Sequence, residues 1–71
     1  MLYNLRAEMA RNGITNADLA KAINKTERKV KDSVAGKYEF KVSEAFDIRN
    51  RFFPSMTMEY LFNRGNDDAK G

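Results

Sequence analysis

At the centre of the sequence, only Asn24 and Lys25 separate a predicted helix over residues 16–23 from Thr26, the capping residue of a second predicted helix over residues 27–35. A link of this length is too short for a hairpin of two long antiparallel helices. It suits two short helices that cross steeply, as in a helix-turn-helix unit. Asparagine tolerates a left-handed backbone better than most other residues, which favours Asn24 as the point where the chain turns.

Two threonines predict where these helices begin. Thr15 and Asp18 match a capping box with aspartate in place of glutamate, so the first of the two helices should follow Thr15. Thr26, followed by an acidic residue, predicts the start of the second. Gly36 supplies the left-handed residue that commonly ends a helix. Capping residues therefore predict where these helices begin and end, in agreement with the spacing of their apolar residues.

The flanking segments also have helical spacing. Leu2, Leu5 and Met9 predict a first helix that Asn12 and Gly13 end. No alternation typical of a strand persists along the chain.

The C-terminal half predicts two more helices. Ser43 is the expected cap of a fourth helix that Pro54 ends, and Thr57 caps a final short helix. The sequence thus predicts an all-α fold, a compact bundle of about five short helices over residues 1–62, followed by a polar, flexible tail over residues 63–71. The expected core positions of the fourth helix are Ala45, Phe46, Ile48 and Phe52.

Composition narrows the possible functions. The chain has no cysteine and no histidine, so it lacks disulfides, thiolate metal sites and the commonest acid–base catalyst. We therefore expect no metal, no cofactor, no small-molecule ligand and no enzymatic activity from a domain too small for a catalytic cleft. No apolar run approaches the roughly 20 residues of a membrane span, and no signal-peptide pattern follows Met1, so we expect a cytoplasmic protein.

The net charge of +3 is concentrated in the middle of the chain. Between Lys21 and Lys41, seven cations face three acids, a surplus of four. Clustered positive charge raises the odds of a polyanionic partner. A solvated, lysine-rich face explains the charge alone equally well.

Residues 4–36, NLRAEMARNGITNADLAKAINKTERKVKDSVAG, resemble the Cro- and repressor-like helix-turn-helix family, often called the Xre family. The opening N-L-R, then G-x-T-x-x-x-L-A and the closing A-G follow that family in order and spacing, and residues 43–62 resemble its last two helices. The resemblance implies a lambda-repressor-like DNA-binding domain whose third helix, residues 27–35, enters the major groove. Ser33 departs from the family pattern, which commonly has a large apolar residue there.

The third helix offers three candidates for base recognition. Val30 and Val34 define its buried direction, and Arg28 and Asp32 then point most nearly away from it. Arg28 suits donation to guanine, and Asp32 either reads a base or orients Arg28. Glu27 is a base-reading position by resemblance and suits a cytosine amine. The structural alternative is an exposed Arg28–Asp32 ion pair, worth about 0.2–0.5 kcal/mol.

Polar residues around this helix are candidates for contact with DNA phosphates or the groove edges, although ordinary solvated side chains would look the same. They are Asn16, Thr26, Lys29, Lys31, Lys37, Tyr38 and Lys41. One recognition helix reads only a few base pairs, so we expect a weak homodimer on DNA, with copies 34–36 Å apart. For Phe53, Met56 and Tyr60 core packing is the favoured role in so short a chain, and an exposed dimer contact is the alternative.

These features predict a small bacterial or phage transcriptional regulator, such as a repressor, that binds a specific site on double-stranded DNA and associates with the nucleoid. A second hypothesis is a protein-interaction module with this fold, such as an antirepressor or antitoxin component. The acids Glu27 and Asp32 on the would-be recognition helix support that alternative. A non-specific nucleoid or RNA binder also stays open.

Overall fold

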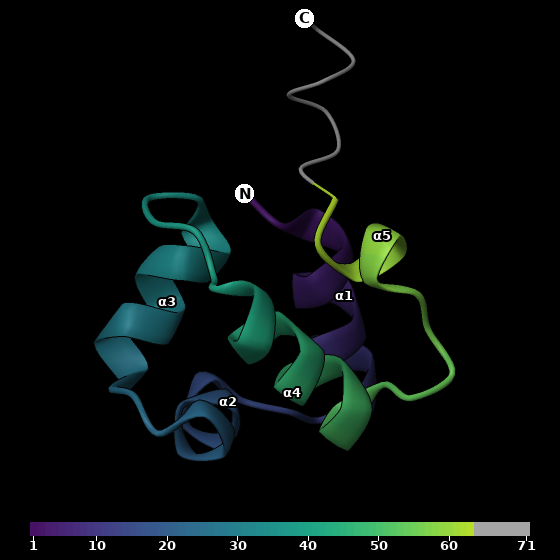
Figure 1. Ribbon diagram of the computed structural model, residues 1–71, viewed down its shortest axis with the longest axis horizontal. Helices are drawn as coiled ribbons and strands as arrows, with labels where there is room; N and C mark the ends of the chain where they lie inside the picture. Colours follow the sequence, from purple (N-terminus) through teal and green to yellow (C-terminus); the bar gives the residue numbers. More distant parts are fainter. Residues whose placement is uncertain (64–71) are drawn as a thin grey trace, which may run out of the picture.

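The computed structural model describes residues 1–63, and these residues form five α-helices. No strand occurs within them, so the predicted all-α bundle is confirmed. Figure 1 shows α3 at one side of the molecule, α4 across its middle, and α1 and α5 beside each other. The helices are α1 (Tyr3–Asn12), α2 (Asn16–Ile23), α3 (Glu27–Ala35), α4 (Val42–Phe52) and α5 (Met58–Leu61).

Two further expectations concern the C-terminal tail and membrane-spanning segments. Of the predicted polar tail, only Asn63 lies within the described residues, and the rest lies outside them. None of the five described helices has both the length and the apolar character needed to cross a membrane.

The core is built around one fully buried side chain from each helix. Around this centre lie further apolar side chains that are at most 8% exposed: Leu2, Met9, Ala20, Ile23, Val34 and Phe53. Each helix therefore has one face whose burial stabilises the bundle. The five central residues are Leu5, Leu19, Val30, Ile48 and Leu61, each 0% exposed.

The caps predicted for α2 and α3 are present. Thr15 Oγ1 accepts a hydrogen bond from the backbone N–H of Asp18 (3.2 Å), and the Asp18 carboxylate accepts one from the backbone N–H of Thr15 (2.9 Å). Thr26 Oγ1 accepts from the backbone N–H of Lys29 (3.1 Å). Between the helices, Asn24 adopts the left-handed conformation, with φ 58° and ψ 47°. The sharp turn at Asn24 and the cap at Thr26 are thus confirmed, and Lys25 is the one residue between them.

The predicted start of α4 is wrong by two residues. Ser43 lies inside the first turn, and Lys41 occupies the N-cap position. The helix can begin there because Glu44 stands three residues later and its carboxylate accepts a hydrogen bond from the backbone N–H of Lys41 (3.0 Å). A glutamate at this position accepts a hydrogen bond from a backbone N–H that has no partner within the helix, so the helix can begin without a serine or threonine cap.

Two aromatic residues near α4 differ in how they fit the sequence-based expectations. Phe46 was expected in the core but is 44% exposed, because Ala45 and Ile48 occupy the inward face of the helix. Phe53 is only 2% exposed, which bears out its favoured role in the core and removes it as a possible dimer contact. The chain bends after α4, where the backbone N–H of Phe53 donates to the carbonyl of Arg49 (2.8 Å), and the Phe53 ring enters the core.

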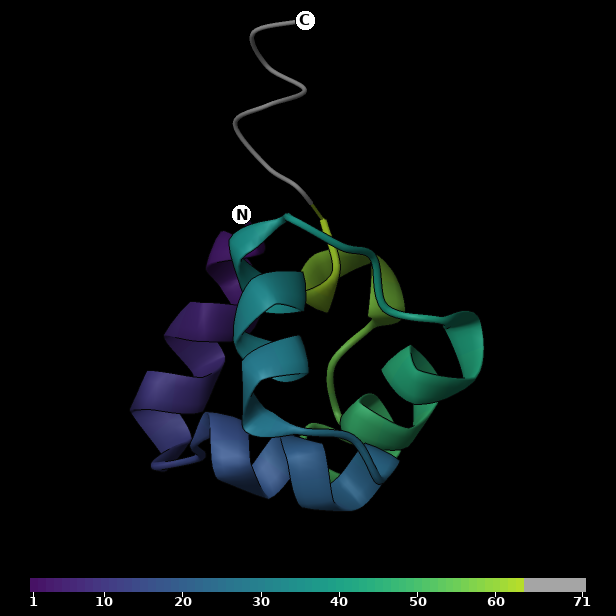
Figure 2. The same cartoon turned by 90° about the vertical axis from the view of Figure 1, so that its left-hand side faces the viewer.

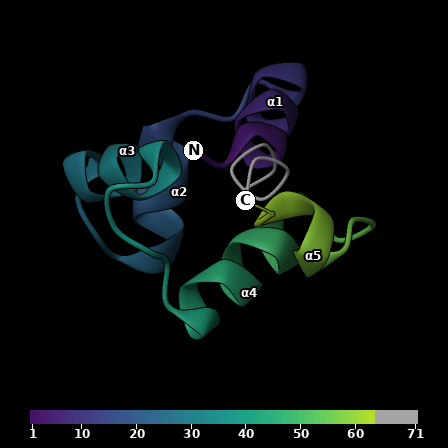
Figure 3. The ribbon, with the colours of Figure 1, turned by 90° about the horizontal axis from the view of Figure 1, so that it is seen from above.

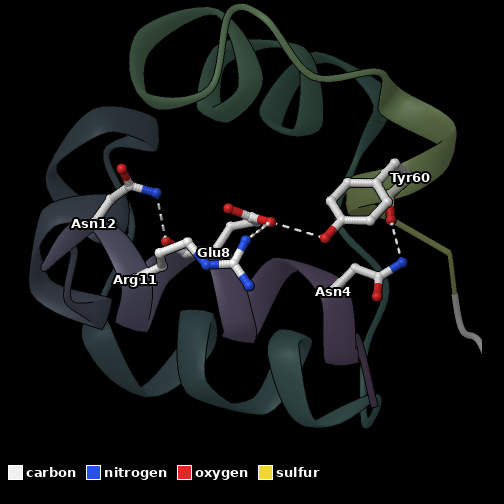
Figure 4. A network of polar contacts seen from close by, with 5 residues as sticks. All are labelled: Asn4, Glu8, Arg11, Asn12 and Tyr60. Carbon is white, nitrogen blue, oxygen red and sulfur yellow. Dashed lines mark hydrogen bonds and ion pairs between the residues drawn. The ribbon is translucent and has the colours of Figure 1, made fainter.

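A polar network joins α5 to α1 (Figure 4). Glu8 is 2% exposed, and its Oε2 accepts hydrogen bonds from the Tyr60 hydroxyl (2.8 Å) and the Arg11 guanidinium (2.7 Å). Asn4 donates its side-chain N–H to the Tyr60 carbonyl (2.8 Å). We call these four residues the α1–α5 clasp. Because α5 is a single turn, the clasp and the burial of Leu61 hold it in place.

Candidate nucleic-acid interface

The outer face of α3 is open along its length. Figure 2 shows this helix crossing the front of the molecule, with α1 to one side and α2 below it. Val30 and Val34 point into the core at 0% and 7% exposure, as the sequence predicts. Arg28 and Lys31 are exposed and Asp32 is half-buried on the side that remains.

One side of this outer face borders a shallow hollow of about 420 Å³ that we call the Asn16 hollow. Asn16 comes from the first turn of α2, where the earliest backbone N–H groups have no partner within the helix. The hollow brings the three predicted base-reading residues together with two of the predicted phosphate-contacting residues. Its lining residues are Asn16, Glu27, Arg28, Lys31 and Asp32.

The other side borders a second hollow of about 380 Å³, the Tyr38 hollow. Its aromatic wall, Tyr38, is 56% exposed and comes from the segment that links α3 to α4. Only Arg28 and Asp32 line both hollows, so they occupy the centre of the outer face. The lining residues are Thr26, Arg28, Lys29, Asp32 and Tyr38.

Two predicted phosphate-contacting lysines lie apart from both hollows. Lys37 and Lys41 are exposed on the link between α3 and α4, and neither lines the Asn16 or the Tyr38 hollow. Lys37 makes only a backbone contact to α3 there, from its N–H to the Asp32 carbonyl (2.9 Å). Their role stays a prediction that depends on the path of a bound strand.

The sequence did not identify Arg6, which belongs to α1. A third hollow, of about 400 Å³, brings Arg6 together with Asn16 and Lys31 at the junction of α1, α2 and α3. Its guanidinium donates to the sulfur of Met1 (3.3 Å), and the side chain is exposed. No local spacing indicates this role, because the position depends on how the N-terminal segment lies beside α3, where the backbone N–H of Leu2 donates to the carbonyl of Val34 (2.9 Å). Arg6 adds a cation beside the Asn16 hollow.

Arg28 and Asp32 do not form the ion pair that was the structural alternative to base recognition. Among residues 1–63, neither side chain forms a hydrogen bond or an ion pair with the other. The guanidinium donors of Arg28 and the carboxylate acceptors of Asp32 therefore remain available to another molecule. A bidentate donor and a carboxylate acceptor side by side suit hydrogen bonding to base edges.

The described residues were also compared with the requirements of a metal site and with known proteins. Within the described part of the chain, no group of three or more Asp, Glu, His or Cys residues could hold a metal ion. Comparisons with protein-family models, with curated proteins and with solved structures found no match to this chain. The case for its function therefore depends on the residues and the geometry of α1, α2 and α3.

Proposed function

We propose that this protein is a small transcriptional regulator of the Cro- and repressor-like kind, which binds a specific site on double-stranded DNA. The observation that carries the proposal is the position of Arg28 and Asp32 between two hollows, each of which also presents candidate phosphate-contacting side chains. A helix in the major groove has base edges in front of it and a phosphate strand on each side. On the outer face of α3, Arg28 and Asp32 lie where the base edges would be, and the two hollows lie where the two phosphate strands would be.

Each part of this face has a role in the proposal. Arg28 donates two of its guanidinium N–H groups to guanine O6 and N7, the commonest specific contact in the major groove. Glu27 and Asp32 accept from base amines. Asn16 and Lys31, with Arg6 beside them, bind phosphates of one strand. The residues for the other strand are Thr26, Lys29 and Tyr38.

Selection of binding sites from a random duplex pool tests the proposal. At roughly 0.15 M salt with competitor DNA, non-specific phosphate binding weakens, so enrichment reports sequence recognition. We expect two half-sites about one helical turn apart, because one helix reads too few base pairs.

Arg28→Ala should relax the preference at one position of each half-site, at a cost of about 1–3 kcal/mol. Arg51→Ala is the matched control, because Arg51 is an exposed arginine at the C-terminal end of α4 and lines neither the Asn16 nor the Tyr38 hollow. Equal effects of the two substitutions would contradict the role of α3.

A protein-interaction module, such as an antirepressor or antitoxin component, is the second candidate. The observation in its favour is that Glu27 and Asp32 lie on the same face as the cations and would meet phosphates unfavourably if misaligned. If no sequence is enriched while the protein remains helical, this candidate replaces the first.

A further inference from the structure

A cavity of about 240 Å³, which we call the Ser33 cavity, lies where the N-terminal segment, the end of α3, α4 and α5 meet. Seen from above in Figure 3, the N-terminus lies between α3 and α5, with α4 on a third side. The backbone N–H of Leu2 donates to the carbonyl of Val34 (2.9 Å), which holds the N-terminal segment against α3. The cavity is therefore formed by segments that are far apart in the sequence and packed together in the fold.

Apolar side chains form most of the wall of the Ser33 cavity. Phe40 and Phe62 line it and pack edge to face, with ring centroids 5.7 Å apart. Leu2 and Ala45 also line it and are 7% and 6% exposed, so the inner part of the wall is buried. An apolar cavity of about 150 Å³ is large enough for benzene, so this larger cavity can hold a molecule with one aromatic ring. Aromatic rings pack well against each other in the offset and edge-to-face arrangements that Phe40 and Phe62 offer.

One buried side chain of this wall is polar. Ser33 lines the cavity from the inner side of α3 and is 2% exposed, and its Oγ has no hydrogen-bond partner among the described residues. Buried polar groups in proteins are nearly always hydrogen-bonded, so an unpaired hydroxyl calls for an explanation. Because Ser33 has so little contact with solvent, a partner for its hydroxyl reaches it by way of the cavity.

The remaining lining residues limit the kind of molecule that fits. Tyr38 and Val42 are 56% and 71% exposed, so the cavity is open to solvent on their side and a small molecule can enter. Among the lining residues that the structure describes, Glu39 has the only charged side chain, which disfavours a carboxylate or a phosphate. The site therefore suits an uncharged molecule.

We propose that the Ser33 cavity binds a small, uncharged aromatic molecule that carries one hydroxyl group, a phenol. The ring packs against Phe40 and Phe62, and the ligand hydroxyl forms a hydrogen bond with Ser33 Oγ. This binding site goes beyond the function proposed above and does not depend on it, because the cavity lies on the inner side of α3 and the binding of a phenol needs no DNA.

Titration of isotope-labelled protein with 4-methylphenol and with toluene, followed by NMR, tests the site. The two probes share the ring and the methyl group, and only 4-methylphenol carries the hydroxyl. At millimolar probe concentrations, we expect 4-methylphenol to shift the backbone N–H signals of Leu2 and Ala45 more than those of α2. No shift at the cavity with either probe would overturn the proposal, and the DNA selection experiment would be unaffected.

Ser33→Ala tests the hydrogen bond to the ligand. We expect this variant to weaken the affinity for 4-methylphenol about tenfold relative to that for toluene, because only the phenol loses a hydrogen bond. The use of both probes on both proteins cancels the difference in their transfer from water. Ser43→Ala is the matched control, because Ser43 is exposed in the first turn of α4 and does not line the cavity. If Ser33→Ala changes the affinity for both probes equally, the proposed class of ligand is wrong.

Discussion

Ser33 shows what a single buried hydroxyl can cost a small domain. It is 2% exposed on the inner side of α3, and its Oγ has no hydrogen-bond partner among the described residues. An unsatisfied buried polar group costs about 1–3 kcal/mol. The sequence indicated the anomaly, since a large apolar residue is common at this position in the family that the chain resembles. Its burial could not be read from Val30 and Val34 alone, because residues of the N-terminus and α4 enclose it.

Replacing Ser33 with alanine should therefore stabilise the protein. We expect Ser33→Ala to raise the free energy of unfolding by about 1 kcal/mol, measured by urea denaturation. Part of this gain reflects the higher helix propensity of alanine. Ser43→Ala, in the exposed first turn of α4, measures that part alone. The burial argument fails if the two substitutions give the same gain.

At the scale of the elements, local chemistry predicted more than tertiary packing did. The caps at Thr15 and Thr26 and the turn at Asn24 depend on neighbours within three or four residues, and each was predicted correctly. Phe46 was expected in the core and is exposed, whereas the bend after α4 brings the Phe53 ring into the core. That bend depends on contacts between elements, which apolar spacing along one helix does not contain.

The left-handed turn between α2 and α3 gives a direct test. At φ 58°, a side chain with a Cβ is strained, and asparagine is strained less than alanine. Asn24→Ala should lower the free energy of unfolding by about 1 kcal/mol, whereas Asn24→Gly should leave it within about 0.5 kcal/mol of wild type or raise it. Thermal unfolding followed by circular dichroism measures both. A tolerated alanine would show that the turn can form without this backbone conformation.

The α1–α5 clasp makes the attachment of α5 dependent on pH. The hydrogen bond to the Glu8 carboxylate raises the pKa of Tyr60 above its ordinary value of 10.0, and burial and the Glu8 charge add to the effect. A proton held more tightly in the folded state stabilises it below pH 10, and this contribution is lost as the pH rises above 10. The free energy of unfolding should therefore decline in that range.

Tyr60→Phe removes both the donor and the titrating group. We expect it to destabilise the protein at neutral pH, because buried Glu8 keeps only its contact with Arg11, and to weaken the decline above pH 10. Tyr3→Phe is the control, since the exposed Tyr3 hydroxyl forms no hydrogen bond within residues 1–63. Unfolding curves at a series of pH values measure both effects. If Tyr60→Phe and Tyr3→Phe both have the stability of wild type at every pH, the proposed role of the Tyr60 hydroxyl is wrong.

At the scale of the whole molecule, the candidate interface combines three helices, and the sequence identified only two of them. Glu27, Arg28 and Asp32 follow from the periodicity of α3 and from the resemblance. Arg6 follows only from the tertiary arrangement that brings α1, α2 and α3 to one junction, which no local pattern contains. The all-helical class was predictable from length, caps and spacing. Of the candidate interface, the residues of α2 and α3 were predictable, and the residue of α1 was not.

Arg6 should contribute through charge and not through sequence reading. We expect Arg6→Gln to weaken binding uniformly across sequences and to reduce the slope of log affinity against log salt by about 1. Arg51→Gln should leave the slope unchanged. Titrations of the selected duplex between roughly 50 and 200 mM salt measure both slopes. An unchanged slope for Arg6→Gln would remove Arg6 from the interface.

The α1–α5 clasp also implies an order of folding. Glu8 and Tyr60 are 52 residues apart, whereas Ile23 and Val30 belong to the same core cluster across the short turn between α2 and α3. Closing the longer loop costs about 2 kcal/mol more in chain entropy, so the α2–α3 pair can form first and α5 docks last. Substitutions in the clasp should then accelerate unfolding and leave the folding rate nearly unchanged. The unfolding rate, and with it the lifetime of the folded protein, would then depend on the contacts between α1 and α5 more than on those between α2 and α3.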